Sequence, residues 1–337
     1  MSSIYIFCEV KSGGVHIAAQ RHFEECILNK RDAYLVTPEA EVRNFNEVGR
    51  VITIDFPKSI YDLRANFRFF LAIKKMQIRN TDVIFSHGIR SGFLVSLFLI
   101  RRVRILIHRH IGRDLSFAYK LFFAVSHIFF SKIYSVSRPE IFVKKTSFFP
   151  ILSPFIVGRG KILSSSRSHT QEPKKNKNIR ILWLSRLEYP KKPLVLVEAL
   201  EKIDPDKYFV TFVGQGHYRD QIISSIDSKE INGQIIDEAN PLDIISSHDA
   251  IVLISDFEGI PFVLQEAMFM NKIVLCSDLP GTRFLGADSF IYVNDENIHD
   301  SINSIFDDSK REFYQSLISR QWNLVRNELH SSYSELA

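Results

Sequence analysis

The chain has 337 residues, of which 45% are hydrophobic and 24% are charged. This length suits two domains with a core each, and the composition is ordinary for a soluble globular protein. Residues 1–163 contain 25 Lys and Arg against 12 Asp and Glu, whereas residues 164–337 contain 18 against 26. A basic first part is therefore joined to an acidic second part.

The apolar runs and the cysteines favour a cytoplasmic protein. The first residues lack a basic segment with a cleavage site, which predicts that there is no signal peptide. The longest apolar run, residues 92–100, is too short to span a bilayer. Cys8, Cys26 and Cys276 lie in apolar strand or helix patterns without paired spacing, which predicts reduced, buried thiols.

The basic first part suits three kinds of partner: nucleic acid, an anionic membrane surface or an acidic substrate. No zinc-finger, RRM or basic-helix pattern supports nucleic acid. The charge excess lies on one part of the chain only, which favours peripheral contact with an anionic membrane, at the inner face of the cytoplasmic membrane.

Apolar runs in the first part predict strands, with helical patterns between most of them. They cover residues 4–10, 33–36, 51–54, 82–86, 104–108 and 132–136. Strands that alternate with helices predict a doubly wound parallel sheet, in which ligands bind beyond the carboxyl ends of the strands. Gly13 and Gly14 join the first strand to a predicted helix, residues 15–28. Such a loop either lets the backbone approach a phosphate or forms a plain turn.

Three histidines lie at the carboxyl ends of these strands. His87 follows the fourth strand, and His108 and His110 flank the end of the fifth. The ordinary role of such a histidine is a hydrogen bond to a backbone carbonyl.

Two stretches combine aromatic and basic residues, at 64–79 and 117–149. A helix with apolar and cationic faces can lie in a membrane interface. Each stretch by itself, however, favours an amphipathic helix that packs on the sheet with its charges in water.

Residues 157–178 are polar and rich in Ser, Lys and Asn, which is typical of a linker. The chain is thus predicted to have a first domain over residues 1–156 and a second over residues 179–315. A C-terminal helical segment, residues 316–337, follows. Strands of the second domain are predicted at residues 179–184, 209–213, 233–237, 250–254 and 272–276. Asp204 and Asp206 match the Asp-x-Asp pattern of metal sites but lie in a polar turn between helix and strand, so we interpret them as a turn.

The most informative stretch is residues 255–270, between two apolar strands. Pro261 suits the first turn of a helix, because its φ is helical and its missing N–H has no partner to lose there. The amides of Phe262 and Val263 are predicted to point out of that helix N-terminus and to favour an anion. Glu258 precedes the helix and Glu266 lies within it, and two such acceptors suit the hydroxyls of a nucleotide sugar.

The segment Glu-Gly-Ile-Pro-Phe-Val-Leu-Gln-Glu-Ala-Met resembles the Glu-x7-Glu signature of the family 4 retaining glycosyltransferases. The resemblance implies the glycosyltransferase-B fold, an α/β architecture of two Rossmann-like domains facing a cleft. It also implies that the last helix crosses back to the first domain.

The resemblance extends to further residues and implies their roles. Ser-Arg-Leu followed by Lys191 is similar to the segment whose Arg and Lys neutralise the donor diphosphate, here Arg186 and Lys191. Lys192 stands where a Gly is usual, so either lysine can point inward. Gly214 and Gly216 are similar to the Gly-x-Gly turn that follows the next strand.

Other implied roles fall on both domains. Gly13 and Gly14 approach the diphosphate and the acceptor, and His110, or alternatively His108, faces the donor sugar. Glu258 binds the sugar and Glu266 the ribose. The remaining donor-binding positions lie at and after Glu258 and comprise Gly259, Ile260, Phe262 and Val263. Thr282 and Arg283 stand where the family commonly has Gly and Glu.

The sequence therefore predicts a metal-independent retaining hexosyltransferase without a cofactor. Its partners are a nucleotide-diphosphate sugar and a saccharide or lipid-linked saccharide acceptor, in bacterial surface polysaccharide synthesis. Three alternatives remain: a nucleotide-sugar epimerase on the same fold, a catalytically silent subunit that binds nucleotide sugar, and a basic nucleic-acid-binding protein.

Overall fold

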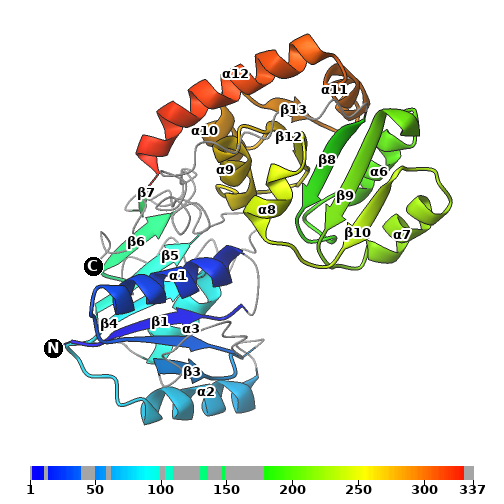
Figure 1. Cartoon of the computed structure of the whole chain (residues 1–337). Coiled ribbons are helices and arrows are strands. Elements are labelled where there is room, and N and C mark those ends of the chain that lie inside the picture. Colours follow the sequence, from blue (N-terminus) through cyan, green and yellow to red (C-terminus); the bar gives the residue numbers. More distant parts are fainter. Residues whose placement is uncertain are drawn as a thin grey trace. The chain divides into compact units, whose positions relative to one another are not determined.

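Figure 1 shows the computed structural model of the chain. The chain divides into two compact units, Met1–Pro154 with His330–Ala337, and Phe155–Leu329. The residues that the structure describes are 2–10, 14–38, 50–57, 62–98, 103–108, 130–135, 146–148 and 178–329. Gly13, His110 and nearly all of the predicted linker lie outside them.

The first unit contains a seven-stranded parallel sheet in the order β3-β2-β1-β4-β5-β6-β7. The strands are β1 (Ile4–Cys8), β2 (Ala33–Thr37), β3 (Val51–Thr53), β4 (Val83–His87), β5 (Val103–His108), β6 (Lys132–Ser135) and β7 (Thr146–Phe148). The described helices are α1 (Gly14–Leu28), α2 (Leu63–Lys75) and α3 (Ile89–Phe98). The six predicted strands are confirmed to within a few residues, and the short β7 is an addition.

The first sheet forms because its central strands are mostly apolar. All five residues of β1 are buried, as expected for a parallel strand that is covered on both faces. Phe7, Ile84 and Leu94 pack in one cluster with Phe69 of α2. The chain runs outward from β1 to β3 and then returns to β4, so the strand order reverses between β1 and β4.

The second unit repeats this arrangement with a six-stranded parallel sheet in the order β10-β9-β8-β11-β12-β13. The strands are β8 (Ile179–Leu184), β9 (Tyr208–Val213), β10 (Gly233–Ile236), β11 (Ala250–Leu253), β12 (Ile273–Ser277) and β13 (Ile291–Val293). Here the order reverses between β8 and β11. Ligands of doubly wound sheets bind at such a reversal, beyond the carboxyl ends of the strands.

The helices of the second unit are short until the last. They are α6 (Pro193–Leu200), α7 (Arg219–Asp227), α8 (Pro241–Ser246), α9 (Phe262–Phe269), α10 (Pro280–Gly286), α11 (Ile298–Ser304) and α12 (Asp308–Val325), with the 3-10 turns η2 (Pro205–Lys207) and η3 (Arg326–Glu328). In Figure 1, α12 lies along α10 and α9, which it contacts. It begins earlier than the predicted C-terminal helical segment, residues 316–337, because the side chain of Asp307 accepts a hydrogen bond from the amide of Lys310.

Several smaller predictions are confirmed. The three cysteines are buried thiols that form no disulfide. Asp204 accepts a hydrogen bond from the amide of Asp206 at 3.0 Å, so the Asp-x-Asp segment is a capped turn. Within the described part of the chain, no helix has both the length and the apolar character needed to cross a bilayer.

Candidate functional site

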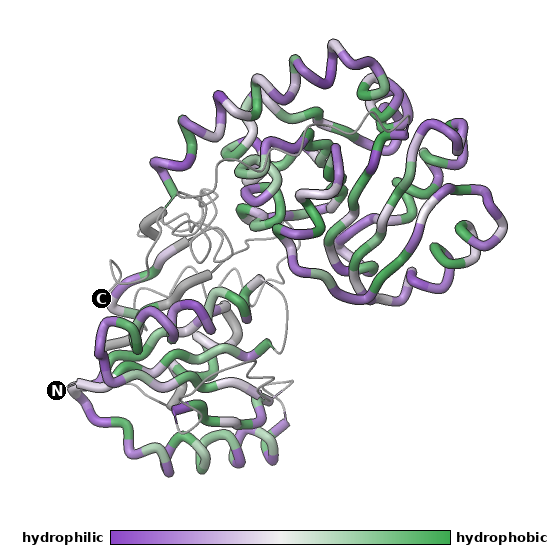
Figure 2. The backbone as a smooth tube through the Cα atoms, viewed as in Figure 1, coloured by the Kyte–Doolittle hydropathy of each residue, from purple (hydrophilic) through white to green (hydrophobic). Residues whose placement is uncertain are grey.

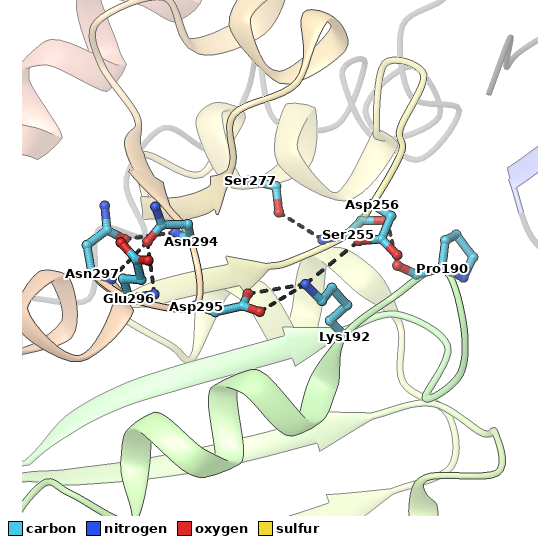
Figure 3. Close-up of polar contacts among 9 residues, drawn as sticks. All are labelled: Pro190, Lys192, Ser255, Asp256, Ser277, Asn294, Asp295, Glu296 and Asn297. Carbon is cyan, nitrogen blue, oxygen red and sulfur yellow. Dashed lines mark hydrogen bonds and ion pairs between the residues drawn. The ribbon is translucent and has the colours of Figure 1, made fainter. Parts of the chain in front are cut away.

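Two loops after the switch strands of the second unit are joined by backbone hydrogen bonds. The loop after β8 ends at Lys192, whose amide donates to the carbonyl of Ile254 at 3.0 Å. The amide of Asp256 donates to the carbonyl of Pro190 at 3.1 Å, and the hydroxyl of Ser255 donates to the same carbonyl at 3.2 Å (Figure 3). The segments that carry the predicted cations and the first predicted carboxylate are thereby held side by side.

The loop after β9 is held against the loop after β8 by two glycines. Gly214 and Gly216 have φ values of +146° and +151°, which residues with a side chain rarely adopt. A Cβ on Gly214 would lie 2.2 Å from the carbonyl oxygen of Ser185, and one on Gly216 would lie 2.3 Å from that of Leu187. The predicted Gly-x-Gly turn therefore serves to bring two backbones together.

Lys191 and Glu258 form the centre of the site. The Nζ atom of Lys191 donates to the Oε1 atom of Glu258, and the two side chains are 13% and 7% exposed. Burial, with a contribution from the positive charge of Arg186, lowers the pKa of the Lys191 ammonium to about 7. The neighbouring carboxylate favours the charged form and opposes this shift. A cation and an anion predicted to bind different parts of one ligand thus neutralise each other here.

Arg186 lies beside this pair but is exposed. Its Nη1 atom donates to the Oε1 atom of Glu188 at 2.6 Å, and its side chain is 56% exposed. An ion pair in water contributes only ~0–1 kcal/mol, so exchange of Glu188 for an anionic ligand costs little.

Lys192 turns away from Glu258. Its Nζ atom lies 3.2 Å from both carboxylate oxygens of Asp295 and 3.7 Å from Asp256 (Figure 3). The loop that holds Asp295 is fixed by its neighbours, since Asn294 Oδ1 accepts hydrogen bonds from the amides of Glu296 and Asn297. Of the two candidate lysines, the structure thus places Lys191 next to the predicted sugar-binding carboxylate.

Helix α9 begins directly after the loop that carries Glu258. Pro261 is the N-cap with ψ 129° rather than the first helical residue, so the helix starts one position later than predicted, at Phe262. The amides of Phe262 and Val263 belong to the first turn, whose N–H groups point towards the N-terminal end of the helix. Gly259 is buried, and its carbonyl oxygen lies so close to Gly281 of α10 that Gly281 has no room for a Cβ.

Glu266 lies on α9 and is 2% exposed. Ile260, at the end of the preceding loop, is 7% exposed. The structure therefore brings Lys191, Glu258 and the first turn of α9 to one end of the second sheet, with Arg186 at the rim and Glu266 buried in the helix.

Residues 164–321 match the model of the glycosyl transferases group 1 family. This segment is a group 1 glycosyl transferase domain. The chain is 27% identical over 296 residues to the capsular polysaccharide glycosyltransferase CapH of Staphylococcus aureus, covering 80% of this chain and 75% of CapH. It is 27% identical over 181 residues to the O-antigen glycosyltransferase WbnH of Escherichia coli, about half of each protein, 52% in both cases.

Solved structures show the fold of the whole chain. The HepE protein of Anabaena, solved with UDP-glucose, superposes with a TM-score of 0.73 and 14% identity over 97% of this chain and 95% of HepE. Sucrose-phosphate synthase of Thermosynechococcus elongatus superposes with a TM-score of 0.77 and 13% identity over 97% and 94%. The chain thus has the glycosyltransferase-B fold that the resemblance implied.

The group 1 domain contains an ion pair that sequence reasoning did not anticipate. Arg283 donates to both carboxylate oxygens of Asp278 at 2.6 Å, and its guanidinium lies 3.7 Å from the ring centroid of Tyr292. The pair holds the pKa of Asp278 below its usual range. Thr282 donates its hydroxyl to the carbonyl of Ser277 at 2.7 Å. The residues that depart from the family pattern therefore fix the start of α10.

Outside the group 1 domain, the structure describes few of the predicted site residues. Gly14 is the exposed first residue of α1, and the backbone of His108 ends β5. His87 ends β4 and is buried, with its Nε2 atom 3.0 Å from the Nδ1 atom of His22. Burial lowers the pKa of His22 to about 3. The sequence analysis missed His22, because only tertiary packing brings it to His87.

Proposed function

We propose that the chain is a glycosyltransferase that moves a sugar from a nucleoside-diphosphate sugar to a saccharide or lipid-linked saccharide acceptor. The observation that carries the proposal is the contact of Lys191 with Glu258 beside the first turn of α9, within a group 1 domain. The structure of HepE in complex with UDP-glucose supports a nucleoside-diphosphate sugar as the donor. The names of CapH and WbnH support a role in the synthesis of a bacterial surface polysaccharide.

The proposed chemistry separates charge. Cleavage of the bond between the anomeric carbon and the phosphate oxygen leaves negative charge on the diphosphate and positive character on the sugar. Lys191, Arg186 and the amides of Phe262 and Val263 would stabilise the diphosphate without a metal ion. Glu258, once Lys191 has turned to the phosphates, would bind sugar hydroxyls and offset the positive charge.

Residues further from the pair complete the proposed donor site. Glu266 would bind the ribose hydroxyls, and Gly13 and Gly14 would approach the diphosphate and the acceptor. His110, or His108 in its place, would face the sugar from the first domain. The proposed outcome is retention of the anomeric configuration, as in family 4.

A thermal-shift panel tests the proposal with UDP, GDP, ADP and their sugars, each with and without magnesium. We expect one nucleotide to stabilise the protein without metal, by ~2.7 kcal/mol at 100 times its dissociation constant. Glu266→Gln should remove the shift, while Glu198→Gln, an exposed carboxylate on α6, should preserve it. A shift that needs magnesium would overturn metal independence.

The alternatives predict different results. An epimerase would convert the stabilising nucleotide sugar without an acceptor, and a silent subunit would bind it without turnover. A nucleic-acid-binding protein would bind RNA or DNA with a steep dependence on salt and would ignore every nucleotide sugar.

A further inference from the structure

Helix α2 of the first unit has a second apolar stripe that the sheet does not cover. Its inner side chains, Phe69 and Ile73, are 1% and 4% exposed and pack in the core of the unit. Leu63, Phe67 and Leu71, in contrast, are 79%, 61% and 40% exposed. The amphipathic pattern predicted a helix with its apolar side chains on the sheet, and these three are the exception.

The three exposed residues form one continuous stripe. They are spaced four apart, so their side chains follow one another along the same side of the helix. Figure 2 shows apolar and polar positions interleaved along α2. Solvent-facing positions of a helix are ordinarily polar, because an exposed apolar side chain gains nothing from water.

Cations lie beside this stripe. Arg64, Arg68 and Lys75 are exposed and fall on one flank of it at helical spacing, and the exposed Lys74 lies in line with the stripe, one turn beyond Leu71. There is no acidic residue between positions 63 and 81. Asp62 is engaged as the N-cap, where it accepts a hydrogen bond from the amide of Ala65 at 2.9 Å.

We propose that this outer face of α2, formed by Leu63, Phe67, Leu71 and the adjacent Arg64, Arg68, Lys74 and Lys75, binds the surface of an anionic phospholipid bilayer. A bilayer surface offers both an apolar layer for the stripe and a negative headgroup layer for the cations. A protein partner would more often meet a rim of both charge signs, whereas the charges on α2 all have one sign. The proposal does not depend on the proposed activity.

The first experiment measures co-sedimentation of the full chain with two kinds of vesicle, phosphatidylcholine alone and phosphatidylcholine mixed with phosphatidylglycerol. We expect binding to the anionic vesicles only, weakened by salt. Arg64→Gln, Arg68→Gln and Lys75→Gln together should reduce the partition constant by about fivefold for each cation removed. The triple variant Leu63→Ser, Phe67→Ser and Leu71→Ser should reduce it by at least ~10-fold.

Matched controls come from the second unit. Phe313 and Leu324 on α12 are 57% and 61% exposed, and Phe313→Ser with Leu324→Ser should leave vesicle binding unchanged. Lys202→Gln with Lys207→Gln, two exposed cations, should likewise have little effect. If these variants reduce binding as much as the α2 variants do, attraction is general and the α2 assignment is wrong.

A second readout places the helix directly. Phe67→Trp adds an exposed indole to α2, whose fluorescence should shift to the blue with anionic vesicles and be quenched by brominated lipid. An unchanged spectrum would overturn the proposal. Dimerisation that the serine variant abolishes, without vesicle binding, would also overturn it and would assign the face to a second copy of the chain.

Discussion

The two sheets have the same reversal of strand order but different polar pairs beside it. In the second unit the loops after β8 and β11 bring together Lys191 and Glu258, a cation and an anion. In the first unit β4 ends at His87, which meets His22 of α1. A lysine and a carboxylate can each exchange their partner for a charged or hydroxylic ligand. A buried histidine with a pKa of about 3 stays neutral and offers no charge.

The comparison therefore separates two kinds of polar burial. A buried histidine that stays neutral supports the fold, whereas a charged pair stores interactions that a ligand can take over. On this view, the charged groups proposed to bind the donor lie in the second unit, and the variants below test that distinction.

The largest effect is expected from the two adjacent lysines. Lys191→Met should weaken binding of the stabilising nucleotide ~100-fold, because a charged hydrogen bond to phosphate contributes up to ~3 kcal/mol. Lys192→Met should change affinity little, since that side chain pairs with Asp295. Isothermal titration calorimetry measures both constants.

A control is needed because Lys191→Met leaves Glu258 buried without its cation, which costs stability. The double variant Lys191→Met with Glu258→Gln removes the unpaired charge. If the double variant regains stability but not nucleotide affinity, the loss belongs to the diphosphate contact. Equal losses for Lys191 and Lys192 would contradict the distinction between them.

A backbone comparison comes next, between glycines with positive φ in the two units. A Cβ on Gly216 would meet the backbone of Leu187, whereas one on Gly88, with φ +105°, would meet its nearest atom at 3.7 Å. Gly88→Ala should cost ~1–3 kcal/mol for its backbone conformation alone. Gly216→Ala should cost more and also weaken nucleotide binding.

Thermal unfolding and calorimetry on both variants provide the measurement. A Gly216→Ala protein with the stability and affinity of the parent would show that the loop after β9 is not held in place by this contact.

A change of pH is expected to have a smaller effect on nucleotide affinity. Above the Lys191 pKa of about 7, the empty site has lost the proton from its amine, and an anionic diphosphate would restore it. Binding should therefore take up a proton, and affinity should fall by at most about tenfold per pH unit above that value. Calorimetry in buffers of different ionisation enthalpy measures the uptake.

Lys191→Met should abolish this proton uptake. An uptake that survives the substitution would assign it to another group, such as the phosphate itself. His22 is not a candidate near neutral pH, because burial keeps its pKa at about 3.

The smallest effect is expected at the rim. Glu188→Gln removes the exposed partner of Arg186, and an exposed pair of this kind contributes ~0–1 kcal/mol. Nucleotide affinity should therefore rise by no more than about fivefold, with the melting temperature nearly unchanged. A weaker affinity would mean that Glu188 itself contacts the ligand.

The amino-acid sequence by itself determined the strands and the family of this protein. Apolar runs predicted the strands, because buried parallel strands are apolar along their length, and β8 agrees residue for residue with the predicted 179–184. The stretch around Glu258 and Glu266 indicated the glycosyltransferase family, since its helix start and carboxylates are local features. The capped turn at Asp204 was predictable for the same reason.

The tertiary structure decided the rest. Lys191 and Lys192 are adjacent in the sequence, but backbone hydrogen bonds hold their loop against the loop after β11. In this arrangement Lys191 contacts Glu258 and Lys192 contacts Asp295. His22 and His87 are 65 residues apart and meet through strand order. The exposed stripe of α2 was hidden in an ordinary amphipathic pattern, because that pattern shows which residues share a side of the helix but not which side the sheet covers.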